Sequence, residues 1–207
     1  MRTVRTRSIL AAAALGASLL ATSAVTSATS AGTTLTARLK PLNHSGVHGT
    51  ATVTVTGTQL NASVDAKGLL ADAPHAVHIH YGATALHECP TMKSAGADRQ
   101  LATLEGLPFY GPVAVSFTTS GDTSPAAVLA IDFYSHAPGG VIDYDRSGIT
   151  TSQTVADAIA AGEGVVVVHG VDYNRNGVYD FEAGTSDLNP SFPAEATDLA
   201  ACGVLHN

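Results

Sequence analysis

Alternating polar and apolar side chains dominate the chain between residues 33 and 65. The alternation recurs in three segments, residues 34–39, 51–56 and 60–65. A period of two is typical of a strand with one buried face and one exposed face. Glycines separate these segments, and this spacing predicts short antiparallel strands joined by turns.

Four later segments are also predicted to be strands: residues 76–81, 113–118, 128–133 and 165–169. The last of them reads Val-Val-Val-Val-His. A continuous apolar run of this length is typical of a strand that is buried on both faces.

One short helix is predicted after residue 150. Thr151 or Ser152 can cap its first turn, Val155 and Ile159 share one face, and Gly162 ends it. Seven or eight strands with a single connecting helix predict an all-β fold, either a β-sandwich or a flattened barrel.

The N-terminal segment predicts secretion. Three arginines precede an apolar stretch, residues 9–20, and small residues follow up to Ala31. This order is typical of a signal peptide, and the apolar stretch is too short to span a bilayer as a stable helix. We therefore expect residues 1–31 to be removed and residues 32–207 to form a single secreted domain.

Removal of the leader makes the chain more acidic. The full sequence has 10 basic and 17 acidic side chains, and three of the basic ones, Arg2, Arg5 and Arg7, lie in the leader. The remaining 7 basic and 17 acidic groups give a net charge near −10. Neither nucleic acid nor an anionic membrane surface is an expected partner of such a chain.

The two cysteines, Cys89 and Cys202, are an even number in a chain destined for an oxidising compartment. This favours one structural disulfide that closes a long loop. In the chain-entropy model such a bond stabilises the fold by about 3 to 5 kcal/mol.

A His-x-His pattern marks the strand predicted for residues 76–81. His78 and His80 should project from one face, with Val77 and Ile79 on the other, because side chains two residues apart in a strand point the same way. Two such imidazoles can converge on one metal ion. His75 lies at an odd offset from His78, and we expect it to form structural hydrogen bonds.

His169, at the end of the apolar run, is the predicted third ligand. A buried histidine is unfavourable unless it is hydrogen-bonded or ligated. Three neutral imidazoles suit copper, zinc, nickel or iron and exclude calcium and magnesium. A fourth, open position would admit water or a small substrate. The alternative is that these histidines are ordinary hydrogen-bonded core residues.

The order of these landmarks resembles the Cu/Zn superoxide dismutase family. Four features show the resemblance: the run His-Ala-Val-His-Ile-His-Tyr-Gly at residues 75–82, Cys89, the Val-Val-Val-His that ends at His169, and the Ala-Cys-Gly-Val around Cys202. The resemblance implies a Greek-key barrel, copper held by the three predicted ligands, a bond between the two cysteines, and superoxide as a small-molecule substrate.

The chain departs from that family in two places. Residues 90–112, where the family has its bridging and zinc-binding histidines, contain none, so we expect no zinc site of this type. Leu199 stands where the family has an arginine that guides superoxide, which argues against efficient dismutation. His87 and His136 are the remaining candidates for a fourth copper ligand.

A second resemblance is to the CHRD domain, an extracellular β-sandwich. It is carried by Val-His-Ile-His-Tyr-Gly, by Gly-Pro-Val-Ala-Val at residues 111–115, and by the helix-to-strand run from Val155 to His169. This resemblance implies a non-catalytic binding or structural domain with the same architecture. Copper-dependent dismutation, copper sequestration and a purely structural role are thus the alternative functions.

Residues 172–180 resemble the opening of a calcium-binding loop. Oxygen-bearing side chains alternate at Asp172, Asn174, Asn176 and Asp180, but Ala183 occupies the twelfth position, where a bidentate acid is required. The alternative is a turn held by hydrogen bonds among its own Asn and Asp side chains.

Overall fold

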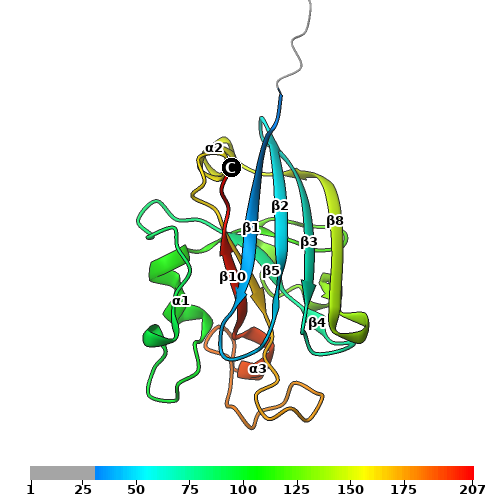
Figure 1. The fold of residues 1–207 in the computed structure, drawn as a ribbon, viewed down its shortest axis with the longest axis vertical. Coiled ribbons are helices and arrows are strands. Elements are labelled where there is room, and N and C mark those ends of the chain that lie inside the picture. The colour runs from blue at the N-terminus through cyan, green and yellow to red at the C-terminus, as the bar shows by residue number, and fades with distance from the viewer. Residues whose placement is uncertain (1–30) are drawn as a thin grey trace, which may run out of the picture.

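Eight antiparallel strands form one curled sheet in residues 31–207, the part of the chain that this computed structural model describes (Figure 1). The order of strands across the sheet is β6-β5-β9-β10-β1-β2-β3-β8. The strands of this sheet are β1 (Thr33–Pro41), β2 (His48–Thr56), β3 (Gln59–Lys67), β5 (Val77–His80), β6 (Val113–Ser116), β8 (Val141–Thr150), β9 (Val165–His169) and β10 (Leu199–Val204). The predicted all-β fold is confirmed.

Shorter elements connect these strands. A two-residue pair, β4 (Pro74–His75) with β7 (Ser135–His136), forms a second small sheet. The helices are α1 (Thr103–Tyr110), α2 (Gln153–Ala160) and α3 (Ala194–Thr197), and the 3-10 turns are η1 (Met92–Ser94), η2 (Pro125–Ala127), η3 (Ile131–Phe133) and η4 (Pro138–Gly140). No helix within residues 31–207 has the length and hydrophobicity needed to cross a bilayer.

Strand β1 joins the two halves of the curled sheet. Its residues 33–39 pair with β2, whereas Lys40 and Pro41 pair with β10. In Figure 1, β1, β2, β3 and β8 lie side by side, and α1 lies on the side away from β8. The main hydrophobic core contains residues from both halves, among them Leu35, Val64 and Val166.

Strand β9 is buried on both faces, as its apolar run predicts. Val166 and Val168 belong to the main core, whereas Val165 and Val167 belong to a second hydrophobic cluster on the opposite face. That second cluster also contains Tyr110, the last residue of α1. The segment around α1 therefore covers the outer face of β9, and no sequence pattern predicted this helix.

The disulfide between Cys89 and Cys202 is present, with 5.8 Å between the two Cα atoms. It joins the segment that precedes α1 to strand β10. The predicted helix is also confirmed as α2, where the Ser152 side chain accepts a hydrogen bond from the backbone nitrogen of Val155.

The strand predicted for residues 128–133 is wrong. The segment forms consecutive tight turns, which start at Pro125 with Ser124 as the cap and continue through η3. Backbone hydrogen bonds such as that from Val128 to Pro125 satisfy the chain locally, so it pairs with no neighbouring strand. The predicted leader, residues 1–31, lies outside the described residues except for Ala31.

Candidate metal centre

Two histidines of the candidate site are placed by the alternation of strand β5. Val77 and Ile79 pack in the main core, so His78 and His80 point to the outer face of the sheet. Both side chains are nevertheless buried, with 2% and 1% of their surface exposed. The ring of Tyr134 packs on His78, and the ring of Tyr110 packs on His80.

His169 reaches the same face from strand β9. In the register of β5 and β9, His78 lies opposite Val167, and His80 lies opposite Val165. Because His169 is two residues beyond Val167, its side chain shares their face, and only 3% of it is exposed. The ring centroid of His169 is 5.2 Å from that of His78 and 6.1 Å from that of His80.

The three histidines form a group that could hold a metal ion. One ring nitrogen from each residue lies within 4.8 Å of those of the other two. These three nitrogens can contact a common ion, so the structure brings together the three predicted ligands, which the sequence separates by up to 91 positions.

Backbone carbonyl groups orient two of the three rings. Nδ1 of His80 lies 2.9 Å from the carbonyl oxygen of Gly111, and Nδ1 of His169 lies 2.6 Å from that of Thr197. A carbonyl oxygen can only accept a hydrogen bond, so each Nδ1 carries the proton. The hydrogen-bond network thus assigns the tautomer that leaves Nε2 of both rings unprotonated.

The Tyr134 hydroxyl orients the third ring. It donates a hydrogen bond to the carbonyl oxygen of Ala127 at 2.6 Å, so its oxygen is left to accept from Nε2 of His78 at 2.8 Å. This arrangement leaves Nδ1 of His78 unprotonated. Metal-binding histidines commonly have such a partner on the second ring nitrogen.

The remaining three nitrogens, Nδ1 of His78 and Nε2 of His80 and His169, are buried and have no hydrogen-bond partner in the described part of the chain. Each of them presents a lone pair. Three buried lone pairs that face one another repel unless a cation or a proton lies between them. The arrangement is therefore better suited to a bound cation than to a hydrogen-bonded core.

Burial keeps these histidines neutral. Burial, together with repulsion from the neighbouring His169, lowers the pKa of His80 to about 3, and burial lowers the pKa of His169 to about 4. Burial also lowers the pKa of His78 well below its usual value, and repulsion from the other two rings adds to this. All three are uncharged at neutral pH, which is the form that binds metal ions.

A glycine permits the contact to His80. Gly111, the residue after α1, has a φ of +83°, and a Cβ there would lie 2.6 Å from the backbone nitrogen of Gly82. Only glycine fits this approach without displacing the chain. The ring of Tyr110 also packs on His80, with 4.3 Å between ring centroids.

His75 has the structural role that its position predicts. Its Nδ1 lies 2.9 Å from the carbonyl oxygen of His169, and its Nε2 lies 3.1 Å from that of Leu70. The Tyr179 hydroxyl is within 3.2 Å of both ring nitrogens. His75 therefore supports the backbone of a predicted ligand and is not a member of the three-histidine group.

The structure does not bring His87 or His136 into this group. Nε2 of His87 is 2.8 Å from the carbonyl oxygen of Gly82, and its ring stacks on Tyr81. His136 is exposed on β7, with Nδ1 3.1 Å from the carbonyl oxygen of Asp72. Neither residue supplies a fourth ligand in this arrangement.

The side chains of the predicted calcium loop gather but bond to one another. The Asp172 carboxylate accepts from the backbone nitrogen of Asn176. The Asn174 amide donates to Asp180 and Glu182, and the Asn176 amide donates to Asp180. These contacts are those of a turn held by its own side chains, and calcium binding stays a prediction.

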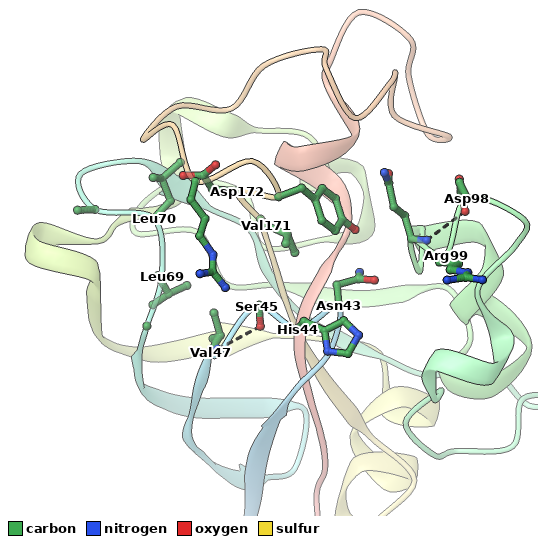
Figure 2. A pocket seen from close by; sticks show the side chains of 16 residues that line it. Asn43, His44, Ser45, Val47, Leu69, Leu70, Asp98, Arg99, Val171 and Asp172 are labelled. Atoms are coloured by element: carbon green, nitrogen blue, oxygen red, sulfur yellow. Dashed lines mark hydrogen bonds between the residues drawn. The ribbon is translucent and has the colours of Figure 1, made fainter.

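The same loop borders a polar cavity of about 520 Å³, which Figure 2 shows. Charged side chains, among them Asp98, Arg99, Asp172 and Arg175, line it together with the loop that contains His44. None of the three clustered histidines faces it.

A different cavity, of about 210 Å³, opens onto the three histidines. Its walls are mostly apolar. They come from β6, from the turns at residues 128–134 and from residues 188–197. The three histidines thus border a space that could admit a small molecule.

Sequence patterns did not reveal the residues that orient the ligands. Tyr134 follows the segment that was predicted to be a strand, and Thr197 and Gly111 act through backbone carbonyl groups. A backbone carbonyl has no residue-specific signature, so these partners emerge only from the fold.

Residues 31–207 thus form a mostly β protein with a disulfide bond and a three-histidine group that could hold a metal ion. No model of a known protein family matches the chain, and no curated protein is a detectable relative of it. The resemblances to the dismutase family and to the CHRD domain therefore stay predictions.

Proposed function

We propose that this protein is secreted and binds Cu(II) between His78, His80 and His169. The observation that carries the proposal is the convergence of three buried, unprotonated ring nitrogens, each within 4.8 Å of the others and without a hydrogen-bond partner among residues 31–207. The signal-peptide pattern and the disulfide support an extracellular location.

The donor set favours Cu(II) over other metals. Imidazole nitrogens bind divalent metals of the first row, and Cu(II) has the highest affinity in that series. Cu(I) prefers soft sulfur ligands. Both cysteines are in the disulfide, and the Met92 sulfur accepts a hydrogen bond from the backbone nitrogen of Asn43 and does not line the cavity beside the three histidines.

A copper-only superoxide dismutase is the second candidate, and the open cavity beside the three histidines favours it. Bound copper would supply one-electron redox chemistry there. However, no described arginine or lysine lines this cavity, so no side chain attracts an anion such as superoxide. Copper binding without rapid dismutation is therefore the better-supported function. A CHRD-like structural role would require no metal.

The test is metal analysis of the secreted protein, followed by Cu(II) titration monitored by electron paramagnetic resonance. We expect one copper per chain, with hyperfine coupling to several nitrogens. The variant His78→Ala/His80→Ala should lose tight copper binding and keep its fold, because both side chains lie outside the main hydrophobic core. His136→Ala, which alters an exposed histidine, should bind copper normally.

Copper content that is unchanged in the double variant would refute the proposed site. If the wild-type protein holds no bound copper after titration, only the structural role remains. A superoxide assay on the copper-loaded sample then separates the two copper functions, and we expect slow turnover.

A further inference from the structure

The cavity above the three histidines has no charged wall. Among its described lining residues there is no aspartate, glutamate, lysine or arginine. Apolar side chains form most of its surface: Val113, Val128, Leu129, Ile131, Leu188 and Pro193. The polar cavity shown in Figure 2, in contrast, has charged side chains of both signs.

The apolar lining of this cavity is partly exposed. Val128, Leu129 and Ile131 lie in the turns at residues 128–134, and each is only half-buried, as are Val113 and Leu188. Apolar side chains that surround a concave space, and that the protein does not itself cover, are typical of a ligand site. A ligand that covers them would be stabilised by removing apolar surface from water.

Almost every polar side-chain group of the lining already has a partner. Thr103 donates to the carbonyl oxygen of Thr197, the Thr197 hydroxyl donates to Ser186, and the hydroxyls of Tyr134 and Tyr179 are also hydrogen-bonded. The exceptions are the three clustered histidine nitrogens. Because these nitrogens are themselves buried, a polar atom of a ligand has one natural place in this cavity, next to an ion that they hold.

We propose that this cavity binds a small, neutral, largely apolar molecule that presents one nitrogen or oxygen lone pair to the metal. The proposal rests on the proposed function for its metal, but the apolar walls do not depend on it. The volume of about 210 Å³ is suitable for a substituted benzene ring, since an engineered apolar cavity of about 150 Å³ binds benzene. A charged ligand would lose its hydration and find no countercharge on the walls.

Tyr134 links the apolar wall to the metal ligands. It lines the cavity at the end of the turns that contain Val128, Leu129 and Ile131, and its hydroxyl holds the ring of His78. A ligand packed on this wall would therefore contact the side chain that orients His78.

Two probes of nearly the same shape distinguish binding to the apolar walls from coordination to the metal. Toluene has no lone-pair donor and reports on the apolar cavity, whereas 4-methylpyridine adds one nitrogen and is neutral at pH 8. We would measure the binding of both by calorimetry and ligand-observed NMR, to the metal-free and the copper-loaded full chain. Sodium azide serves as the anionic comparison.

We expect toluene to bind both forms with similar affinity. We expect 4-methylpyridine to bind the copper-loaded form at least about tenfold more tightly than toluene and to add a nitrogen to the copper resonance spectrum. Leu129→Asn and Leu188→Asn should each weaken toluene binding about tenfold. Leu86→Asn, which alters a leucine that is 61% exposed and outside the cavity, should have no effect.

Three results would overturn the inference, each in a different way. Normal copper binding without toluene binding would refute the apolar cavity and leave the proposed function intact. Toluene binding without copper binding would refute the metal and therefore the place assigned to the lone pair. Azide that binds the copper-loaded form more tightly than 4-methylpyridine would show that the cavity selects anions.

Discussion

At the scale of single residues, the site depends on which nitrogen of each histidine carries the proton. His80 and His169 donate from Nδ1 to carbonyl groups, whereas His78 donates from Nε2 to Tyr134. His78 thus has the opposite tautomer, with the proton on Nε2, and its Nδ1 is free to face the other two rings. The three partners thus set the direction of every lone pair in the group.

Tyr134→Phe tests this arrangement. The variant loses the hydroxyl that orients His78 and that satisfies the carbonyl group of Ala127. We expect Cu(II) affinity to fall about 10-fold to 100-fold and the free energy of unfolding to fall by about 1 kcal/mol. A competition titration against a chelator measures the affinity.

Tyr144→Phe is the matched control for that variant. Tyr144 is also buried and donates to a carbonyl oxygen, that of Thr118, but it lies on β8 away from the histidines. Its loss should affect stability alone. Equal copper affinity in Tyr134→Phe and the wild type would show that Tyr134 does not position His78.

At the scale of elements, the segment from Cys89 to Tyr110 covers His80. The disulfide joins the start of this segment to β10, and α1 places the Tyr110 ring on His80. The carbonyl group of Gly111, at the end of α1, then holds His80. Sequence patterns missed α1 because its Gly106 and Pro108 obscure a helical periodicity.

Removing the disulfide should loosen this covering segment. In the variant Cys89→Ala/Cys202→Ala we expect the free energy of unfolding to fall by about 3 to 5 kcal/mol, because the bond closes a long loop. Cu(II) affinity should fall as well, since His80 loses its fixed partner. Urea denaturation and copper titration measure the two effects, and the double variant avoids reductants that would also reduce copper.

A variant as stable as the wild type would show that packing alone holds the segment. Loss of stability with unchanged copper affinity would show that the disulfide does not help to position His80.

The turns at residues 128–134 form a second covering segment that the sequence pattern did not reveal. The pattern predicted a strand there, but the segment forms tight turns, and its apolar side chains line the cavity.

At the scale of the whole molecule, the buried histidines make the stability of the metal-free protein dependent on pH. Their pKa values in the folded state, about 3 for His80 and about 4 for His169, lie below the value of 6.5 expected in the unfolded chain. The unfolded state therefore binds protons first as the pH falls. The contribution of these neutral histidines to the free energy of unfolding is complete above pH 6.5 and is lost progressively as the pH falls toward 4.

We therefore expect the free energy of unfolding of the metal-free protein to fall more between pH 7 and pH 5 than that of the variant His80→Gln/His169→Gln. The comparison is needed because burial raises the pKa of Asp198 to about 7. The stability that this carboxyl group contributes is complete below pH 3.8 and is lost as the pH rises through 7. This trend is opposite to that of the histidines. Because Asp198 is present in both proteins, its effect cancels in the comparison. Urea denaturation at both pH values measures the difference, and parallel losses would contradict the prediction.

The sequence by itself determined the features that depend on local periodicity and composition. Alternation in residues 34–39, 51–56 and 60–65 was sufficient for an antiparallel sheet, because a strand repeats every two residues. The same period placed His78 and His80 on one face, opposite Ile79. Two cysteines behind a signal-peptide pattern predicted one disulfide, and the structure contains it.

Only the tertiary structure decided what those histidines face. The order β5-β9 brings His169 beside His78, and partners 28 to 56 residues away in the sequence, Thr197, Gly111 and Tyr134, set the ring orientations. The uncharged walls of the cavity come from turns and loops without periodic patterns. Local periodicity cannot encode such contacts, because they depend on how distant segments pack and not on the repeat within one of them.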